Sequence, residues 1–179
     1  RIRQSIPAKG ATANFLKQVS GPRGEILVFI SYSPCGFEIV DLEGRAFTIP
    51  GTAVELLNRD GWMIEDISPD MSATVVQQKD TGNLRVLRSS AEESLDLWTI
   101  DDFTKHSRGF LRAIPYYVSI SPCGRAVAFI FSCTLRIVNA VSGATILDWN
   151  YPWGKNGPLM FDRTSRWLTC VHSDNKFEL

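Results

Sequence analysis

The sequence lacks an excess of charge of either sign and lacks any long hydrophobic run. Its 179 residues carry 19 Lys and Arg against 19 Asp and Glu, so the formal net charge is zero. A protein that neutralises many phosphates usually carries a basic excess, and nucleic acid is therefore an unlikely leading partner. The longest apolar stretches, Ile26–Ile30 and Ala126–Phe131, are far shorter than the ~20 residues of a membrane-spanning helix. We expect no membrane partner.

Cysteine is also scarce, and its spacing carries no signal for a metal site. The four cysteines, Cys35, Cys123, Cys133 and Cys170, form no C-x-x-C pair, and the chain contains no N-x-S/T acceptor. This pattern favours reduced thiols in an intracellular protein, either cytoplasmic or nuclear. It predicts neither a metal nor another cofactor.

The motifs of common catalytic sites are missing as well. The chain has no G-x-S-x-G elbow, no H-E-x-x-H pair and no phosphate-cradling glycine loop. Its two histidines, His106 and His172, stand in polar turns. The acidic pairs Glu92-Glu93 and Asp101-Asp102 are sequence neighbours, and neighbouring side chains on a strand point apart. We therefore predict a protein that is not an enzyme.

What the sequence does contain is an internal repeat. The segment that begins at Ser119 matches the segment that begins at Asp66. Three blocks match in turn: Ser121-Pro122 with Ser68-Pro69, Leu135–Val138 with Leu84–Leu87, and Leu147–Trp149 with Asp96–Trp98. Two further copies begin near Gln18 and at Met160. A recurring unit of this kind is the primary signal for a repeat architecture.

Each repeat unit predicts four short strands. The first strand ends in a turn such as Ser121–Gly124, where proline presets φ and glycine accepts a positive φ. The second strand is an unbroken apolar run, such as Val127–Phe131, which is typical of a strand covered on both faces. The third strand alternates, as in Leu135–Ile137, and a turn such as Ser142-Gly143 or Glu43-Gly44 precedes the fourth.

Four-stranded units of roughly 40 residues favour a β-propeller over a sandwich or a small barrel, because neither of those folds requires the unit to recur. The predicted fold class is all-β, a β-propeller of four-stranded blades with about three and a half blades present. The predicted divisions are a leader over residues 1–13, blades over about 14–50, 62–98, 116–150 and 158–179, and an interblade insert over 99–115.

The repeat resembles the WD-repeat family and its looser relatives among β-propellers. The resemblance rests on an S-P-x-G turn followed by an apolar strand, then Thr134–Asn139, then a small turn and a closing strand. The equivalent segment Phe37–Asp41 ends in Asp, as the family's Trp-Asp pair does. No unit has the family's Gly-His pair or an intact Trp-Asp at the end of its third strand. The family's His–Asp hydrogen-bond network is therefore not expected here.

The resemblance implies a rigid platform that binds other proteins and has little catalytic activity of its own. We expect a non-enzymatic protein–protein interaction scaffold, a subunit or domain of a larger intracellular complex. Loop side chains would carry this function. Two loops between units supply the candidate partner-binding residues: Tyr151, Trp153 and Lys155 in one, and Phe103, Arg108, Phe110 and Arg112 in the other. The alternative for each loop is local packing of its own hydrophobic residues.

Two other functions stay open from the residues. The first is a sialidase-like hydrolase, because Ser68–Thr74 partly resembles the Asp-box turn of such propellers, although it lacks the glycine and the closing aromatic residue. The second is a propeller that contacts RNA in a ribonucleoprotein assembly. Residues 1–24 would make that contact, since they carry five basic residues and no acid: Arg1, Arg3, Lys9, Lys17 and Arg23.

Three other tryptophans are expected to be structural. Trp98 and Trp149 fall at equivalent positions of the repeat, which predicts that both pack between units. Trp167 opens an apolar strand and is expected in the core. The sequence given stops within the third strand of the fourth unit, so we expect the propeller to be completed by further strands of the same polypeptide or of a partner.

Overall fold

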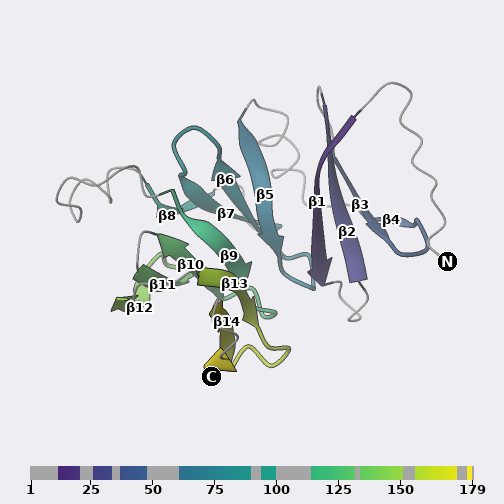
Figure 1. The fold of residues 1–179 in the computed structure, drawn as a ribbon. Coiled ribbons are helices and arrows are strands. Elements are labelled where there is room, and N and C mark those ends of the chain that lie inside the picture. The colour runs from purple at the N-terminus through teal and green to yellow at the C-terminus, as the bar shows by residue number, and fades with distance from the viewer. Residues whose placement is uncertain are drawn as a thin grey trace.

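The computed structural model describes residues 12–20, 26–33, 37–47, 61–89, 94–99, 114–131, 134–150, 156–172 and 177–178. Strands are the regular elements of these residues, and they group into four antiparallel sheets (Figure 1). The first sheet contains β1 (Thr12–Ser20), β2 (Ile26–Ser33), β3 (Phe37–Asp41) and β4 (Ala46–Phe47). The second contains β5 (Trp62–Ile67), β6 (Ala73–Gln78), β7 (Leu84–Arg88) and β8 (Leu95–Trp98).

The third and fourth sheets follow the same plan. The third contains β9 (Tyr116–Ile120), β10 (Ala126–Phe131), β11 (Thr134–Asn139) and β12 (Thr145–Asn150). The fourth has three described strands, β13 (Asn156–Phe161), β14 (Leu168–His172) and β15 (Phe177–Glu178). Strands that are consecutive in the chain are neighbours in every sheet, so the predicted all-β class and the four-stranded unit are confirmed.

The first strands of successive sheets lie side by side. β5 lies beside β9, and β9 lies beside β13. The sheets therefore stack face to face, with each new sheet added next to the preceding one (Figure 1). This arrangement buries both faces of a middle sheet.

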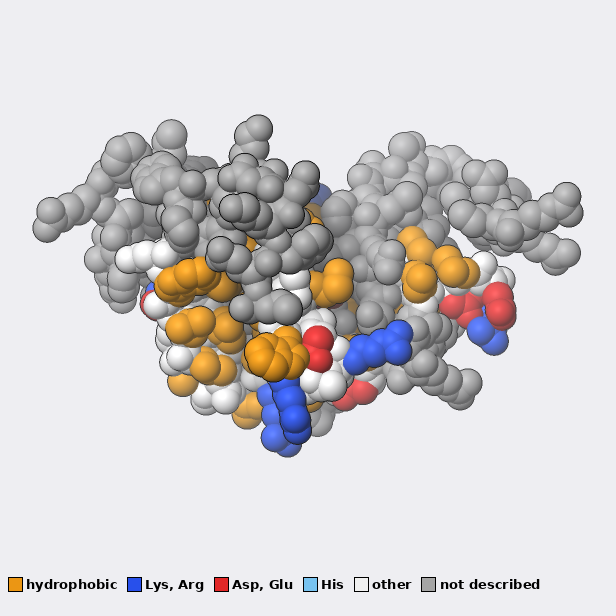
Figure 2. Space-filling view, turned by 60° about the horizontal axis from the view of Figure 1, so that its bottom comes forward, with side chains coloured by type: hydrophobic (Ala, Val, Ile, Leu, Met, Phe, Trp, Pro, Cys, Tyr) orange, Lys and Arg blue, Asp and Glu red, His pale blue; other side chains and the backbone are white. Residues whose placement is uncertain are grey.

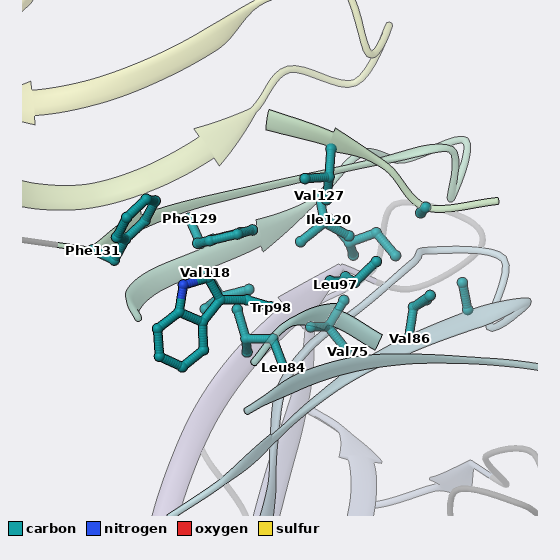
Figure 3. Close-up of a cluster of buried hydrophobic side chains, with 13 residues drawn as sticks. Val75, Leu84, Val86, Leu97, Trp98, Val118, Ile120, Val127, Phe129 and Phe131 are labelled. Carbon is teal, nitrogen blue, oxygen red and sulfur yellow. The ribbon is translucent and has the colours of Figure 1, made fainter. Parts of the chain in front are cut away.

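The unbroken apolar run of β10 is buried on both sides, as its sequence predicts. Val127, Phe129 and Phe131 belong to a cluster with residues of the second sheet (Figure 3). Ala128 and Ile130 belong to a second cluster with residues of the fourth sheet. Side chains alternate across a strand, so one strand contributes to both interfaces.

The turns between the first and second strands have the same hydrogen bonds in three sheets. In each, a side-chain oxygen accepts a hydrogen bond from the backbone N–H five residues later. The three pairs, each at 2.9 Å, are Ala73 N with Ser68 Oγ, Ala126 N with Ser121 Oγ, and Trp167 N with Asp162 Oδ1. This identity confirms the alignment of Ser68 with Ser121 and shows that an aspartate takes the same place in the fourth sheet.

The same turns place one residue each in the left-handed region of the backbone. Gly124 has φ 65°, as expected for a glycine at this point, whereas the equivalent positions hold Met71 and Ser165, each with φ 60°. A side chain at positive φ is strained relative to glycine. The hydrogen bonds of the turn, rather than the residue type, therefore determine this conformation.

The tryptophans divide into a buried and an exposed group. Trp98 is buried between the second and third sheets, and its ring centroid lies 6.4 Å from that of Phe131, so the prediction for Trp98 is confirmed. Trp167 is 62% exposed, and the expectation that it lies in the core was wrong. Leu168 and Cys170 pack toward the third sheet, and alternation turns Trp167 to the opposite face of the fourth sheet.

Candidate interaction site

The partner-binding residues predicted from the sequence lie outside the described residues. They are Tyr151, Trp153 and Lys155, and Phe103, Arg108, Phe110 and Arg112. The described segment Ile114–Tyr117 contains the last two residues of the 99–115 insert and the first two residues of β9. Its exposed apolar side chains form the strongest described candidate for a contact surface.

We call the surface of Ile114, Tyr116 and Tyr117 the aromatic edge. The three residues are 36%, 36% and 41% exposed, respectively. The two tyrosine rings meet edge to face, with centroids 5.2 Å apart and an interplanar angle of 70°. Edge-to-face contacts of this kind favour a fixed ring arrangement over free rotation of two separate side chains.

A β-bulge brings both tyrosines to the surface. Tyr116 pairs with Ile130 and Ser119 pairs with Ala128, so two residues of β9 face the single residue Phe129 of β10. Tyr117 stands in this bulge with φ 51°. In a regular strand, adjacent side chains point to opposite faces. The bulge removes this constraint and re-aims a side chain, a common use of bulges near functional sites.

The aromatic edge is fastened to the second sheet at two points. The buried Gln77 side chain donates a hydrogen bond of 2.7 Å from Nε2 to the Pro115 carbonyl. Ile114 packs on Gly82, where an added Cβ would lie 3.0 Å from the isoleucine side chain. Gly82 also has φ 75°, so glycine is required there for both backbone and space. The tyrosines therefore stand on a held backbone rather than on a free loop.

The partial Asp-box sequence forms a self-contained turn. The Asp70 carboxylate accepts hydrogen bonds from the Ser68 hydroxyl at 2.7 Å, and from the Ser72 hydroxyl and backbone N–H at 2.7 and 3.0 Å. Burial raises the pKa of Asp70, but these hydrogen bonds outweigh it and leave the pKa below its ordinary value. The carboxylate thus closes its own turn, as a folding motif does.

Asp41, which the WD-repeat resemblance matches to the family's aspartate, has a similar local role. Its carboxylate accepts hydrogen bonds from the backbone N–H groups of Glu43 and Arg45, both at 2.9 Å, and also pairs with the Arg45 guanidinium. These bonds shape the turn between β3 and β4. Among the described residues, Asp41 therefore serves its own turn.

The described residues contain neither of two other kinds of feature, a metal-binding cluster or a membrane-spanning helix. No group of three His, Cys, Asp or Glu side chains among them could hold a metal ion. No helix among them has the length and apolar character needed to cross a membrane. Cys123 and Cys170, the two described cysteines, are free thiols.

The sequence contained a usable signal for the aromatic edge. Two adjacent tyrosines, Tyr116 and Tyr117, open a strand whose neighbours face covered interfaces. A regular strand would bury one of the two rings, so adjacency pointed to an irregular backbone. The sequence contains no comparable signal for the exposed arginines of the turns after β9 and β13, which are Arg125, Arg163 and Arg166, because each turn by itself predicts only a chain reversal.

Comparison with known proteins supports the fold alone. No protein-family model matches the chain, and no curated protein sequence matches it. A solved structure described as TolB from Agrobacterium tumefaciens is similar, with a TM-score of 0.51 and 15% sequence identity. The match covers 93% of this chain and 61% of the TolB chain, so the chain spans less than two thirds of that protein. The sheet architecture is of the β-propeller type.

Proposed function

We propose that this chain is a non-enzymatic protein–protein interaction scaffold that binds a partner through the aromatic edge. The observation that carries the proposal is the exposed, edge-to-face pair of Tyr116 and Tyr117 on a backbone held by Gln77 and Gly82. Tyrosine gives a large contact area at a low cost in conformational entropy and is enriched among residues that dominate binding energy. The proposal includes an intracellular location, membership of a larger complex and a divergent, WD-like repeat.

One of the predicted loops adjoins this surface in the sequence. The candidate residues Phe103, Arg108, Phe110 and Arg112 belong to the insert over residues 99–115, which ends directly before the two tyrosines. Tyr151, Trp153 and Lys155 belong to the corresponding connection between β12 and β13. Both connections run from the last strand of one sheet to the first strand of the next, so partner contacts would draw on equivalent parts of the repeat.

The test is affinity capture from cell extract with the chain as bait, followed by mass spectrometry. Tyr117→Gly is the informative variant, because glycine fits the positive φ and removes the ring. We expect it to lose specific partners and to keep its melting temperature, while Lys79→Gln, an exposed control, keeps both. Partners that disappear only on nuclease treatment would favour the RNA alternative. Turnover of a panel of glycosides and esters would contradict the non-enzymatic assignment.

We also propose that the free face of the fourth sheet takes a further β-sheet, from the same polypeptide or from a partner. Met160 and Trp167 are 66% and 62% exposed on this face. The equivalent face of the second sheet, which includes Ala73 and Val75, is covered by the third sheet. Substitution of Met160 and Trp167 by Ser should reduce self-association of the chain in analytical ultracentrifugation. Unchanged association would contradict this second proposal.

A further inference from the structure

A second surface, which is polar, lies at the end of β9 that is opposite to the aromatic edge. We call it the arginine edge, and it consists of the turn after β9 (residues 121–125) and the turn after β13 (residues 162–167). The Cys123 backbone N–H donates a hydrogen bond of 3.2 Å to Ser165 Oγ, so the two turns touch. In Figure 1 they lie together at the lower edge of the molecule.

Three arginines project from these two turns. Arg125, Arg163 and Arg166 are all exposed, and none of them has an ion-pair partner among the described residues. The other charge on the two turns is Asp162, which leaves a net charge of +2 on a chain whose net charge is zero. Figure 2 brings this lower edge forward and shows Lys and Arg side chains projecting from it.

The local aspartate is committed to the backbone and does not neutralise the arginine side chains. Asp162 accepts hydrogen bonds from the Thr164 hydroxyl and from the backbone N–H groups of Thr164, Arg166 and Trp167. The Thr164 hydroxyl and these backbone groups lower the pKa of Asp162 from 3.8 to about 2. Its charge therefore holds the turn in shape, and the guanidinium groups remain available to a ligand.

The backbone beneath Arg125 is fixed in the same way. Its N–H donates to Ser121 Oγ at 3.2 Å, and its carbonyl accepts a hydrogen bond of 2.8 Å from Ala140 N. Arg88 from β7 donates to the neighbouring Gly124 carbonyl at 2.6 Å. A fixed backbone reduces the entropy lost when a ligand orders the side chain, so these turns suit binding by charge.

We propose that the arginine edge binds an acidic segment of a partner protein. A guanidinium group pairs with a carboxylate through two parallel hydrogen bonds, and three such groups match a short run of Glu or Asp. RNA is the weaker candidate, because three phosphate contacts supply little of the counterion release that drives nucleic-acid binding. This surface is separate from the aromatic edge, so either proposal can fail alone.

The test measures fluorescence anisotropy of a labelled glutamate octapeptide with the full chain, at about 50 mM and about 300 mM salt. A glutamine octapeptide and a uridine octanucleotide serve as comparison probes. We expect the glutamate peptide to bind best and to weaken with salt. Replacing Arg125, Arg163 and Arg166 together by Gln should weaken binding by about tenfold or more, while their replacement by Lys should keep part of it.

Three control variants make the result specific. Lys79→Gln removes an exposed charge from the β6–β7 turn, and Tyr117→Gly alters the aromatic edge, so both should bind the peptide within about twofold of the unsubstituted chain. The single reversal Arg163→Glu should lower affinity without lowering the melting temperature. The proposal is overturned by absence of peptide binding, by unchanged affinity in the triple Gln variant, or by tighter binding of the uridine probe.

Discussion

Trp98 and Trp149 occupy equivalent positions in the second and third sheets but differ in their surroundings. Each lies opposite a leucine of the preceding strand, Leu84 for Trp98 and Leu135 for Trp149. Trp98 is 1% exposed and Trp149 is 45% exposed. Phe131 of the third sheet covers Trp98, with the two ring centroids 6.4 Å apart. Equivalent positions of the repeat therefore differ in burial, and the local sequence does not determine it.

The largest expected effect comes from truncating these two rings. Trp98→Ala should lower the free energy of unfolding by about 3–5 kcal/mol, because it leaves a large cavity between two sheets. Trp149→Ala should cost about 1 kcal/mol, since much of its ring is already in water. Urea denaturation of both variants measures the difference. Equal losses would mean that Trp149 is covered in solution and would remove the contrast between the two regions.

The next effect concerns the polar link across the buried interface. Arg88 of β7 donates hydrogen bonds to the carbonyls of Gly124 and Ala140 in the third sheet, at 2.6 and 3.4 Å. Arg88→Ala should cost about 1.5–3 kcal/mol, because it removes a charged donor from carbonyls of buried residues. Arg125→Ala is the matched control on the exposed turn and should change stability by less than about 0.5 kcal/mol. If Arg125→Ala lowered the free energy of unfolding as much as Arg88→Ala, the loss in Arg88→Ala would not be due to its hydrogen bonds across the interface.

The contrast also explains how far the sequence could predict this molecule. The repeat identified the four-stranded unit, because apolar runs, turn residues and paired positions are local features. The repeat did not predict the exposure of Trp167. The burial of this ring depends on what packs against its face of the fourth sheet, and not on the residues beside it in the chain. The sequence alignment of the repeats also matches Asp148 with Leu97. In the structure, however, Asp148 forms an ion pair with Arg136 and Asp96 forms one with Arg85, so Asp96 is the equivalent of Asp148. A one-residue register shift in the β7–β8 pair accounts for the difference.

The candidate site was predicted less completely than the fold. The predicted loop residues follow from composition, whereas the exposure of Tyr116 and Tyr117 follows from a bulge in β9. A bulge depends on the register of two strands, which a single sequence specifies weakly. The arginine edge depends on contact between two turns that are far apart in the chain, here through Cys123 and Ser165, which are 42 residues apart. Such contacts become visible only when the sheets are stacked.

A smaller effect is the difference in how the equivalent turns of the third and fourth sheets make stability depend on pH. The pKa of Asp162 is about 2 in the folded chain against an ordinary 3.8, so the charged form favours the fold. Its contribution is present above about pH 4 and is lost as the pH falls to about 2. Asp162→Ser copies the Ser121 turn and should make melting less sensitive to acid over that range. Asp70 and Asp41 also have lowered pKa values, so some acid sensitivity should remain.

The smallest expected effect exchanges residue types between equivalent left-handed positions. Met71→Gly relieves a side chain at φ 60° but adds freedom to the unfolded chain, so stability should change by less than about 1 kcal/mol. Gly124→Ala should cost about 1–2 kcal/mol, because its Cβ would lie 3.3 Å from Ser72 Oγ at φ 65°. Thermal and urea unfolding measure both. If Met71→Gly proved as costly as Gly124→Ala, the methionine would be required in its turn, and the three turns would not share one backbone preference. A smaller change in Met71→Gly than in Gly124→Ala would instead mean that the hydrogen bonds fix the backbone of each turn. Close contact between sheets would then determine which residue each turn accepts.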